Sequence, residues 1–175
     1  MSISSAPLVP SPIRLATNED GMKLAALIAG CFSEYEGCLY EPSEFPELLR
    51  PADHYDALSA RLWCVDGPGA TLVGSISARP WPERGCVEIG KMYVAMSQRG
   101  NGLAQRLMQE ALAFARGTNA REMMLWTDTR FTRAHAFYEK LGFVRQMGER
   151  ASGDVSFTWE YHYRLVLQPD SVSRL

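Results

Sequence analysis

The chain has 175 residues, with 18 Lys and Arg against 20 Asp and Glu, and 46% of its residues are hydrophobic. This length and composition are typical of one compact globular domain. The formal net charge of −2 gives no basic field that would recruit nucleic acid or an anionic membrane. No apolar run approaches the roughly 18 residues of a membrane span. We therefore expect neither nucleic acid nor a membrane among its partners.

Hydrophobic periodicity and turn residues predict elements in the order β-α-α-β-β-β-α-β-α-β-β, a mixed α/β sheet flanked by helices. The first part comprises a strand at 13–16, a helix at 18–31 capped by Asn18, an irregular stretch at 32–51, a helix at 52–60, and strands at 62–66 and 71–78 joined as a hairpin. The second part comprises a strand at 87–94, a helix at 101–116 stopped by Gly117, a strand at 122–127, a helix at 133–141 capped by Thr132 and ended by Gly142, and strands at 143–147 and 157–167.

The two ends read as tails around a domain at 13–167. Residues 1–12 are rich in Ser and Pro and carry no Lys or Arg, so they lack the charged start of a signal peptide and predict a flexible N-terminal tail. Residues 168–175 form a short polar tail. Without a secretion signal, the cysteines are expected to be reduced in a cytoplasmic protein.

The cysteines do not point to a metal. None of the four forms a C-x-x-C pair, and the chain has only three histidines. We expect no metal site, and small buried side chains are the ordinary interpretation for cysteines in apolar strand segments. The four are Cys31, Cys38, Cys64 and Cys86.

A glycine-rich turn at 99–104 follows an apolar strand and opens the strongest amphipathic helix. Glycine lets the backbone approach a ligand, and the helix start offers unpaired N–H groups, so the turn is typical of a pyrophosphate cradle. A P-loop would need Lys and Ser or Thr where Leu103 and Ala104 stand, and a dinucleotide fingerprint would need Gly at Gln105. Two interpretations of the turn remain. It is either a loop that binds coenzyme A or a turn whose glycines only begin a helix.

Two segments together resemble the GNAT family of N-acetyltransferases. Arg99, Gly102 and Ala104 fit the signature R/Q-x-x-G-x-G/A, and the segment 134–143 is similar to A-x-x-x-Y-x-x-x-G-F. The resemblance covers residues 13–167. It implies a mixed, mostly antiparallel sheet in which the strands before the two signature helices splay apart, so that the pantetheine arm of the cofactor enters the gap.

The resemblance implies an acetyl-CoA-dependent N-acetyltransferase that transfers acetyl directly to a primary amine, with acetyl-CoA as co-substrate and no metal. Backbone groups of the strand end would hold the pantetheine amides and polarise the thioester oxygen, and the loop would hold the pyrophosphate, with Arg99 adding charge. The implied cofactor-binding residues are Met92, Tyr93, Val94, Arg99, Gly100, Asn101, Gly102, Leu103 and Ala104.

Two residues match the catalytic positions of the family. Glu88 would be the general base that deprotonates the amine, and Tyr138 the general acid that protonates the leaving thiolate. The alternative interpretations are that Glu88 is a solvated carboxylate of its strand and that Tyr138 only packs on the apolar face of its helix. Other carboxylates that could serve as base are Glu83, Asp128 and Glu160. The chain has Phe131 where many members have an Asn that touches the cofactor, and Thr132 or Arg133 could take over that contact.

The acceptor is less well defined. Seven acids stand between 34 and 56, with Arg50 as the only Lys or Arg, which predicts either a wall that attracts a cationic amine or a solvated face. The acids are Glu34, Glu36, Glu41, Glu44, Glu47, Asp53 and Asp56. Aromatic residues that could line an acceptor site or pack in the core are Tyr35, Trp81, Tyr93, Trp126 and Trp159. A small amine, an amino acid, an antibiotic and a peptide amine all fit.

Two other functions fit the same residues. One is a non-catalytic acyl-CoA-binding sensor, which would keep the cofactor loop without turnover. The other is an interaction module whose aromatic last strand, 157–167, forms a homodimer or partner surface.

Overall fold

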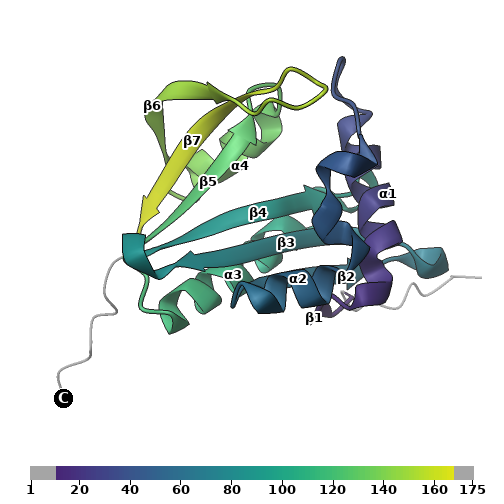
Figure 1. Cartoon of the computed structure of the whole chain (residues 1–175), viewed down its shortest axis with the longest axis horizontal. Coiled ribbons are helices and arrows are strands. Elements are labelled where there is room, and N and C mark those ends of the chain that lie inside the picture. The colour runs from purple at the N-terminus through teal and green to yellow at the C-terminus, as the bar shows by residue number, and fades with distance from the viewer. Residues whose placement is uncertain (1–10, 168–175) are drawn as a thin grey trace, which may run out of the picture.

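The structure is a computed structural model that describes residues 11–167, so the predicted tails lie almost wholly outside the described residues. Its centre is a seven-stranded sheet of order β1-β2-β3-β4-β5-β7-β6, with only β4 and β5 parallel to each other (Figure 1). The strands are β1 Ile13–Leu15, β2 Arg61–Asp66, β3 Leu72–Trp81, β4 Cys86–Val94, β5 Glu122–Asp128, β6 Val144–Ala151 and β7 Trp159–Val166. The mixed, mostly antiparallel sheet and the predicted order of elements are confirmed.

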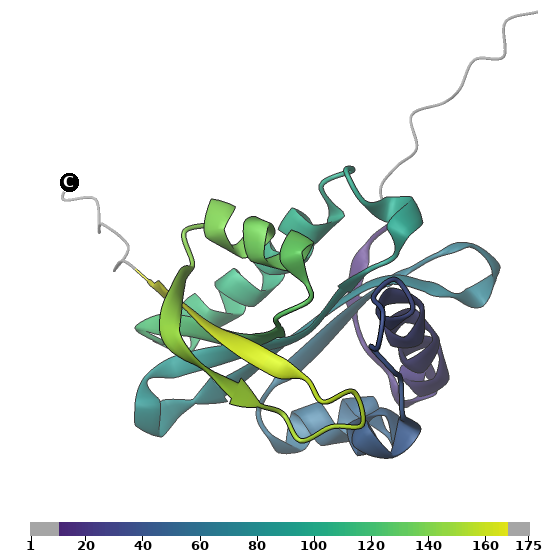
Figure 2. The ribbon, with the colours of Figure 1, turned by 90° about the horizontal axis from the view of Figure 1, so that it is seen from above.

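Helices cover both faces of the sheet (Figure 2). They are α1 Gly21–Phe32, α2 Pro51–Ala57, α3 Leu103–Gly117 and α4 Thr132–Lys140. α1 and α2 lie on one face and α3 and α4 on the other. The expected irregular stretch between α1 and α2 contains two short 3-10 turns, Pro42–Glu44 and Pro46–Leu49. Within residues 11–167 no helix has the length and apolarity needed to cross a bilayer.

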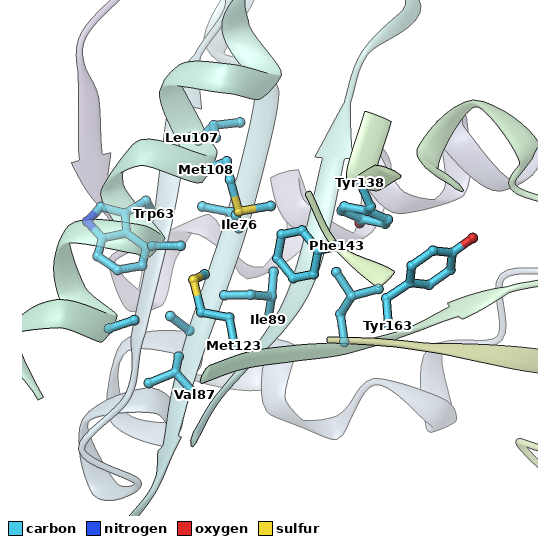
Figure 3. Close-up of a cluster of buried hydrophobic side chains, with 14 of the residues drawn as sticks. Trp63, Ile76, Val87, Ile89, Leu107, Met108, Met123, Tyr138, Phe143 and Tyr163 are labelled. Carbon is cyan, nitrogen blue, oxygen red and sulfur yellow. The ribbon is translucent and has the colours of Figure 1, made fainter. Parts of the chain in front are cut away.

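The larger core lies between the sheet and the helices α3 and α4 (Figure 3). Leu107 and Ala111 of α3, one helical turn apart, are fully buried against Ile76 and Val87 of the sheet. A smaller core joins α1 to β2 on the opposite face. The apolar face of this helix, predicted as the strongest amphipathic helix, therefore packs α3 against the sheet.

Both predicted helix caps at Asn18 and Thr132 are wrong. Thr17 precedes a 3-10 turn at Asn18–Asp20, and its backbone N–H donates to Asp20 Oδ2 at 2.8 Å. The side chain of Asn18 instead donates to Asp53 at 2.9 Å. Thr132 is the first residue of α4 and makes no cap. Asn18 is the first residue of that 3-10 turn and precedes α1, whose N-cap is Asp20, while the N-cap of α4 is Phe131, so neither predicted residue occupies the capping position.

β4 and β5 separate at the end that leads to α3 and α4. Their pairing runs from Cys86 opposite Glu122 to Ile89 opposite Leu125. Beyond Ile89, β4 follows β3 through an irregularity at Lys91, where φ is +46°, while β5 stays paired with β7. The diverging strands are visible in Figure 1. The expected gap therefore exists, and it leaves the last residues of β4 without a neighbour on one side.

Candidate active site

A cleft of about 440 Å³ opens between the end of β4, the glycine-rich turn and α4. It contains every residue predicted to bind the cofactor except Asn101. Its wall further includes Cys31 and Tyr35 from the α1 side, and Arg133 and Lys140 from α4. We call it the cofactor cleft.

The turn has the backbone expected of an anion cradle. Gly100 and Gly102 have φ of +78° and +77°, a conformation that side chains with a Cβ rarely adopt. α3 begins directly after Gly102, and its first-turn residues Leu103 and Ala104 line the cleft. The N–H groups of a first helical turn have no partner within the helix, and the positive end of the helix dipole lies behind them. This part of the cleft fits a phosphate.

The side chain of Arg99 is not free to serve that cradle. Its guanidinium forms a two-pronged ion pair with Glu34, at 2.5 and 2.7 Å, and also donates to the carbonyl oxygen of Val94. The other cations on the cleft wall are Arg133, whose guanidinium lies 3.8 Å from Glu34 in a longer ion pair, and Lys140.

Tyr138 lies at the inner end of the cleft. It is only 5% exposed, and its ring packs against those of Phe137, Phe143 and Tyr163 at centroid distances of 5.7 to 6.1 Å. Figure 3 shows it beside Phe143 and Tyr163. Burial raises its pKa well above that of a free phenol, so the hydroxyl keeps its proton through the physiological pH range. Packing and proton donation are therefore compatible roles for this side chain.

A second hollow of about 240 Å³ shares part of its wall with the cofactor cleft. Both are lined by Met92, Tyr93, Phe131, Ala134 and Tyr138. The rest of the wall of the second hollow carries polar side chains, among them Lys91, Asp128 and Glu160, beside apolar ones such as Phe45 and Trp126. Tyr138 thus stands where two cavities of different character adjoin.

Phe131 forms part of the partition between the two hollows. Its ring centroid lies 4.7 Å from that of Tyr35 and 5.9 Å from that of Phe32. The hydrogen bond that an Asn at this position could donate is replaced by an aromatic wall. The sequence showed the departure, but only the packing shows what Phe131 contacts.

Glu88 is absent from the walls of both hollows. Its Oε2 accepts a hydrogen bond of 2.9 Å from the indole of Trp81, and it stands on β4 two residues before Gly90, which does line the second hollow. Glu83 belongs to neither wall. The structure therefore does not place the two predicted catalytic side chains in one cavity.

Asp128 and Glu160 do line the second hollow. Both oxygens of Asp128 accept from the guanidinium of Arg130, and Oε2 of Glu160 accepts from Arg150 at 2.7 Å. Both are thus carboxylates held in place by a neighbouring arginine.

None of the seven acids at 34–56 lines the second hollow. Most have partners: Glu34 with Arg99, Glu47 with Lys91, Asp53 with Arg50, Asp56 with Arg61, and Glu44 with the backbone N–H of Val155. Of the predicted aromatic lining, Tyr93 and Trp126 line this hollow, Tyr35 lines the cofactor cleft, and Trp81 and Trp159 line neither. The structure favours a structural role for the acidic run over an acidic wall.

Residues 11–167 contain no group of three or more His, Cys, Asp or Glu side chains arranged to hold a metal ion.

Known proteins resemble this chain in sequence and in fold. The N-acetylaspartate synthetases of Rattus norvegicus and Homo sapiens are 39% identical to it over 109 residues, which is 57% of this chain and 36% of theirs. The chain thus spans just over a third of the length of these relatives. An acetyltransferase of the GNAT family from Staphylococcus aureus Mu50 superposes with a TM-score of 0.76 at 18% identity, covering 90% of this chain and 99% of that one.

A Salmonella typhimurium structure that contains acetyl-CoA as its cofactor superposes with a TM-score of 0.69 at 16% identity, covering 93% of this chain and 97% of that one. The family model described as "Acetyltransferase (GNAT) family" matches residues 25–143. This match contains both the glycine-rich turn and the segment around Tyr138. The chain therefore belongs to the GNAT family of acetyltransferases.

Proposed function

We propose that this chain is an acetyl-CoA-dependent N-acetyltransferase that transfers acetyl directly to a primary amine. The observation that carries the proposal is the shared wall of the two hollows. A cleft with a phosphate-type cradle and a polar hollow of small volume adjoin at Tyr138. This arrangement allows both substrates to be bound at the same time.

The cofactor cleft fits acetyl-CoA, which supplies the activated acetyl thioester. The segment from Gly100 to Ala104, Asn101 included, would hold the pyrophosphate through its backbone. Arg133 and Lys140 would supply positive charge from the opposite wall. The backbone of Met92, Tyr93 and Val94 lies beyond the last pairing of β4 with β5, so its groups on that side would bind the pantetheine amides and polarise the thioester carbonyl. The carbonyl oxygen of Val94 is excepted, because it already accepts from Arg99.

Tyr138 would be the general acid. Because burial raises its pKa, the phenol remains protonated and can donate to a thiolate. Its ring is fixed by three aromatic neighbours, so the hydroxyl has a defined position at the junction of the hollows.

A carboxylate near the second hollow would be the general base. An alkyl amine with a pKa of about 10 is only about 0.1% neutral at pH 7, so deprotonation must be assisted. We retain Glu88, acting through water, because its strand continues into the wall of the hollow at Gly90. Asp128 and Glu160 lie in the wall itself and are the alternatives to be tested beside it.

Direct transfer is favoured over an acetyl-cysteine intermediate. All four thiols are buried, and burial raises the pKa of each, to about 11 for Cys38 and about 12 for Cys64. Cys31 lines the cofactor cleft, but its Sγ is directed to the carbonyl oxygen of Val94 at 3.7 Å. A protonated buried thiol is a poor nucleophile.

The second hollow would hold the acceptor. Its volume of about 240 Å³ suits a small molecule, and its wall offers both a cation, Lys91, and carboxylates. Such mixed charge suits a zwitterionic amino acid. The name of the curated relatives adds L-aspartate to the candidates.

The test uses the purified chain. Calorimetry should show saturable binding of acetyl-CoA, and thiol release should be measured with L-aspartate, other amino acids, polyamines, aminoglycosides and peptides as acceptors. Release of free CoA that depends on one of these amines supports the enzyme. Binding without turnover for every acceptor would favour a sensor, and absence of binding would refute the assignment.

A further inference from the structure

Arg99 joins three parts of the cofactor cleft. Its Nη1 and Nη2 donate to the two carboxylate oxygens of Glu34 at 2.5 and 2.7 Å, while Nε and Nη2 donate to the carbonyl oxygen of Val94 at 3.1 and 3.0 Å. Glu34 follows α1, Val94 ends β4, and Arg99 begins the glycine-rich turn. The end of a helix, the end of a strand and the loop before α3 are thereby fixed to one guanidinium.

The ion pair is well shielded and remains charged. The side chain of Glu34 is 15% exposed and that of Arg99 is 28% exposed. The hydrogen bonds from Arg99 lower the pKa of Glu34, and the same bonds raise the pKa of Arg99. If Arg99 turned toward a phosphate, it would leave a largely buried carboxylate without its closest partner, which is costly.

The residues around Glu34 belong to the same wall. Cys31 and Tyr35 flank it in sequence and line the cleft, and Tyr35 in turn contacts Phe131 at the partition. A shift of Glu34 would therefore move the side of the cleft that faces the glycine-rich turn.

We infer that Arg99 is a positioning residue, whose pair with Glu34 sets the width of the cofactor cleft, and that its charge does not bind the phosphates of the cofactor. This inference rests on the proposed binding of acetyl-CoA in that cleft. The inference also makes Glu34, which lies outside both signature segments, a positioning residue of the cleft wall.

The two roles of Arg99 predict opposite effects of Glu34→Gln. If Arg99 bound phosphate, Glu34 would compete for it, so removing the carboxylate charge would tighten acetyl-CoA binding. If Arg99 positions the wall, Glu34→Gln weakens the pair and loosens the cleft. Binding of acetyl-CoA then falls, and Arg99→Met lowers it in the same way.

The experiment measures dissociation constants by calorimetry for acetyl-CoA and for acetylpantetheine, which has no phosphates. The proteins are wild type, Glu34→Gln, Arg99→Met and the double variant. We expect each single variant to bind both ligands about 10-fold more weakly, and the double variant to be no weaker than the worse single variant. Arg99→Lys should not restore binding, because an ammonium keeps the charge but cannot form the two-pronged bond.

Arg133→Met is the control, because Arg133 lines the same cleft but is 69% exposed and approaches Glu34 only to 3.8 Å, without the two-pronged hydrogen bond of Arg99. This variant should bind acetyl-CoA more weakly than wild type and should bind acetylpantetheine with unchanged affinity. Melting curves and circular dichroism of every variant show whether weaker binding comes from unfolding of the protein or from a changed cleft in a folded protein.

Tighter binding of acetyl-CoA by Glu34→Gln, unchanged acetylpantetheine binding by Arg99→Met, or full rescue by Arg99→Lys would each overturn the positioning role while leaving the proposed function intact. Absence of acetyl-CoA binding by wild type would overturn both.

Discussion

The backbone N–H of Phe143 donates to the carbonyl oxygen of Tyr138 at 3.0 Å. With the bond from Gly142 N–H to Glu139, and with φ of +91° at Gly142, it closes α4 in a Schellman motif. The ring of Phe143 is 2% exposed and packs 5.8 Å from that of Tyr138. The tyrosine and the Gly-Phe pair of the second signature are therefore one structural unit, in which the helix end fixes the position of Tyr138.

Tyr138→Phe keeps the ring and its packing but removes the proton. Turnover should fall by roughly 10- to 10⁴-fold, the range of a lost general acid, with little change in acetyl-CoA affinity. Steady-state kinetics and calorimetry test this. The control is Tyr163→Phe, which removes a buried hydroxyl bonded to Glu139 and should leave turnover near wild type. Wild-type turnover in Tyr138→Phe would leave this residue with a packing role only.

Gly102→Val should abolish most acetyl-CoA binding. A Cβ at Gly102 meets only Gln105, at 3.9 Å, so the protein has room for it, but the added side chain would stand where a phosphate must approach. Gly69→Val is the control, since Gly69 also has a positive φ, +64°, and open space around a Cβ, in a hairpin turn that is not part of the cleft wall. Both variants should lose similar stability from backbone strain.

Only Gly102→Val should lose affinity, by 10-fold or more in calorimetry, since a bulky side chain at the cradle excludes the ligand and costs upwards of about 1.4 kcal/mol. Equal affinities in both variants would mean that the glycines of the turn only begin the helix and do not bind the cofactor.

Glu88→Gln should depress the rate most near neutral pH, where an amine acceptor is protonated. Part of the activity should return as the pH rises toward about 10 and neutral amine becomes available without a base. The control is Glu122→Gln, a carboxylate of the same sheet that pairs with Arg164 and lines neither hollow. A pH–rate profile parallel to wild type would transfer the base role to Asp128 or Glu160, and Asp128→Asn and Glu160→Gln then decide between them.

Asp20 should make folding stability depend on pH. Its side chain is 2% exposed and accepts from Arg14 at 2.7 and 2.9 Å, which holds its pKa well below the usual value. Because the folded pKa is lowered, this stabilisation is present above the unfolded pKa of about 4 and is lost as the pH falls below it. Urea unfolding at pH 7 should show a loss of about 3 kcal/mol for Asp20→Asn, with a smaller loss at pH 3.

Asp66→Asn is the control for Asp20→Asn. Asp66 pairs with the same Arg14 but is 49% exposed, so solvent screening limits its effect to under about 1 kcal/mol. Equal losses for both variants, or a loss for Asp20→Asn that does not change with pH, would contradict the assignment.

Local sequence determined the elements and their order. The i, i+4 stripe of α3, the positive φ at Gly100, Gly102 and Gly142, and the end of α4 each depend on residues within about one or two helical turns. The same holds for the turn proposed to bind pyrophosphate, which consists of one turn and the first residues of one helix. Such features can be predicted because the backbone conformation of a short segment follows from its own side chains.

Tertiary structure decided which charges meet. Arg99 and Glu34 are 65 positions apart, and no pattern near Arg99 shows that its guanidinium is already occupied. Glu47, one of the acids at 34–56, likewise pairs with Lys91 of β4, and this contact depends on how the two segments pack together. Glu88 and Tyr138 were both chosen by motif position, but Val87 and Ile89 of β4 pack in the core with Tyr138, and Glu88 between them points to the other sheet face because a strand alternates its side chains. An ion pair or a shared cavity depends on how distant segments dock, and that docking is set by the packing of the whole sheet and its helices.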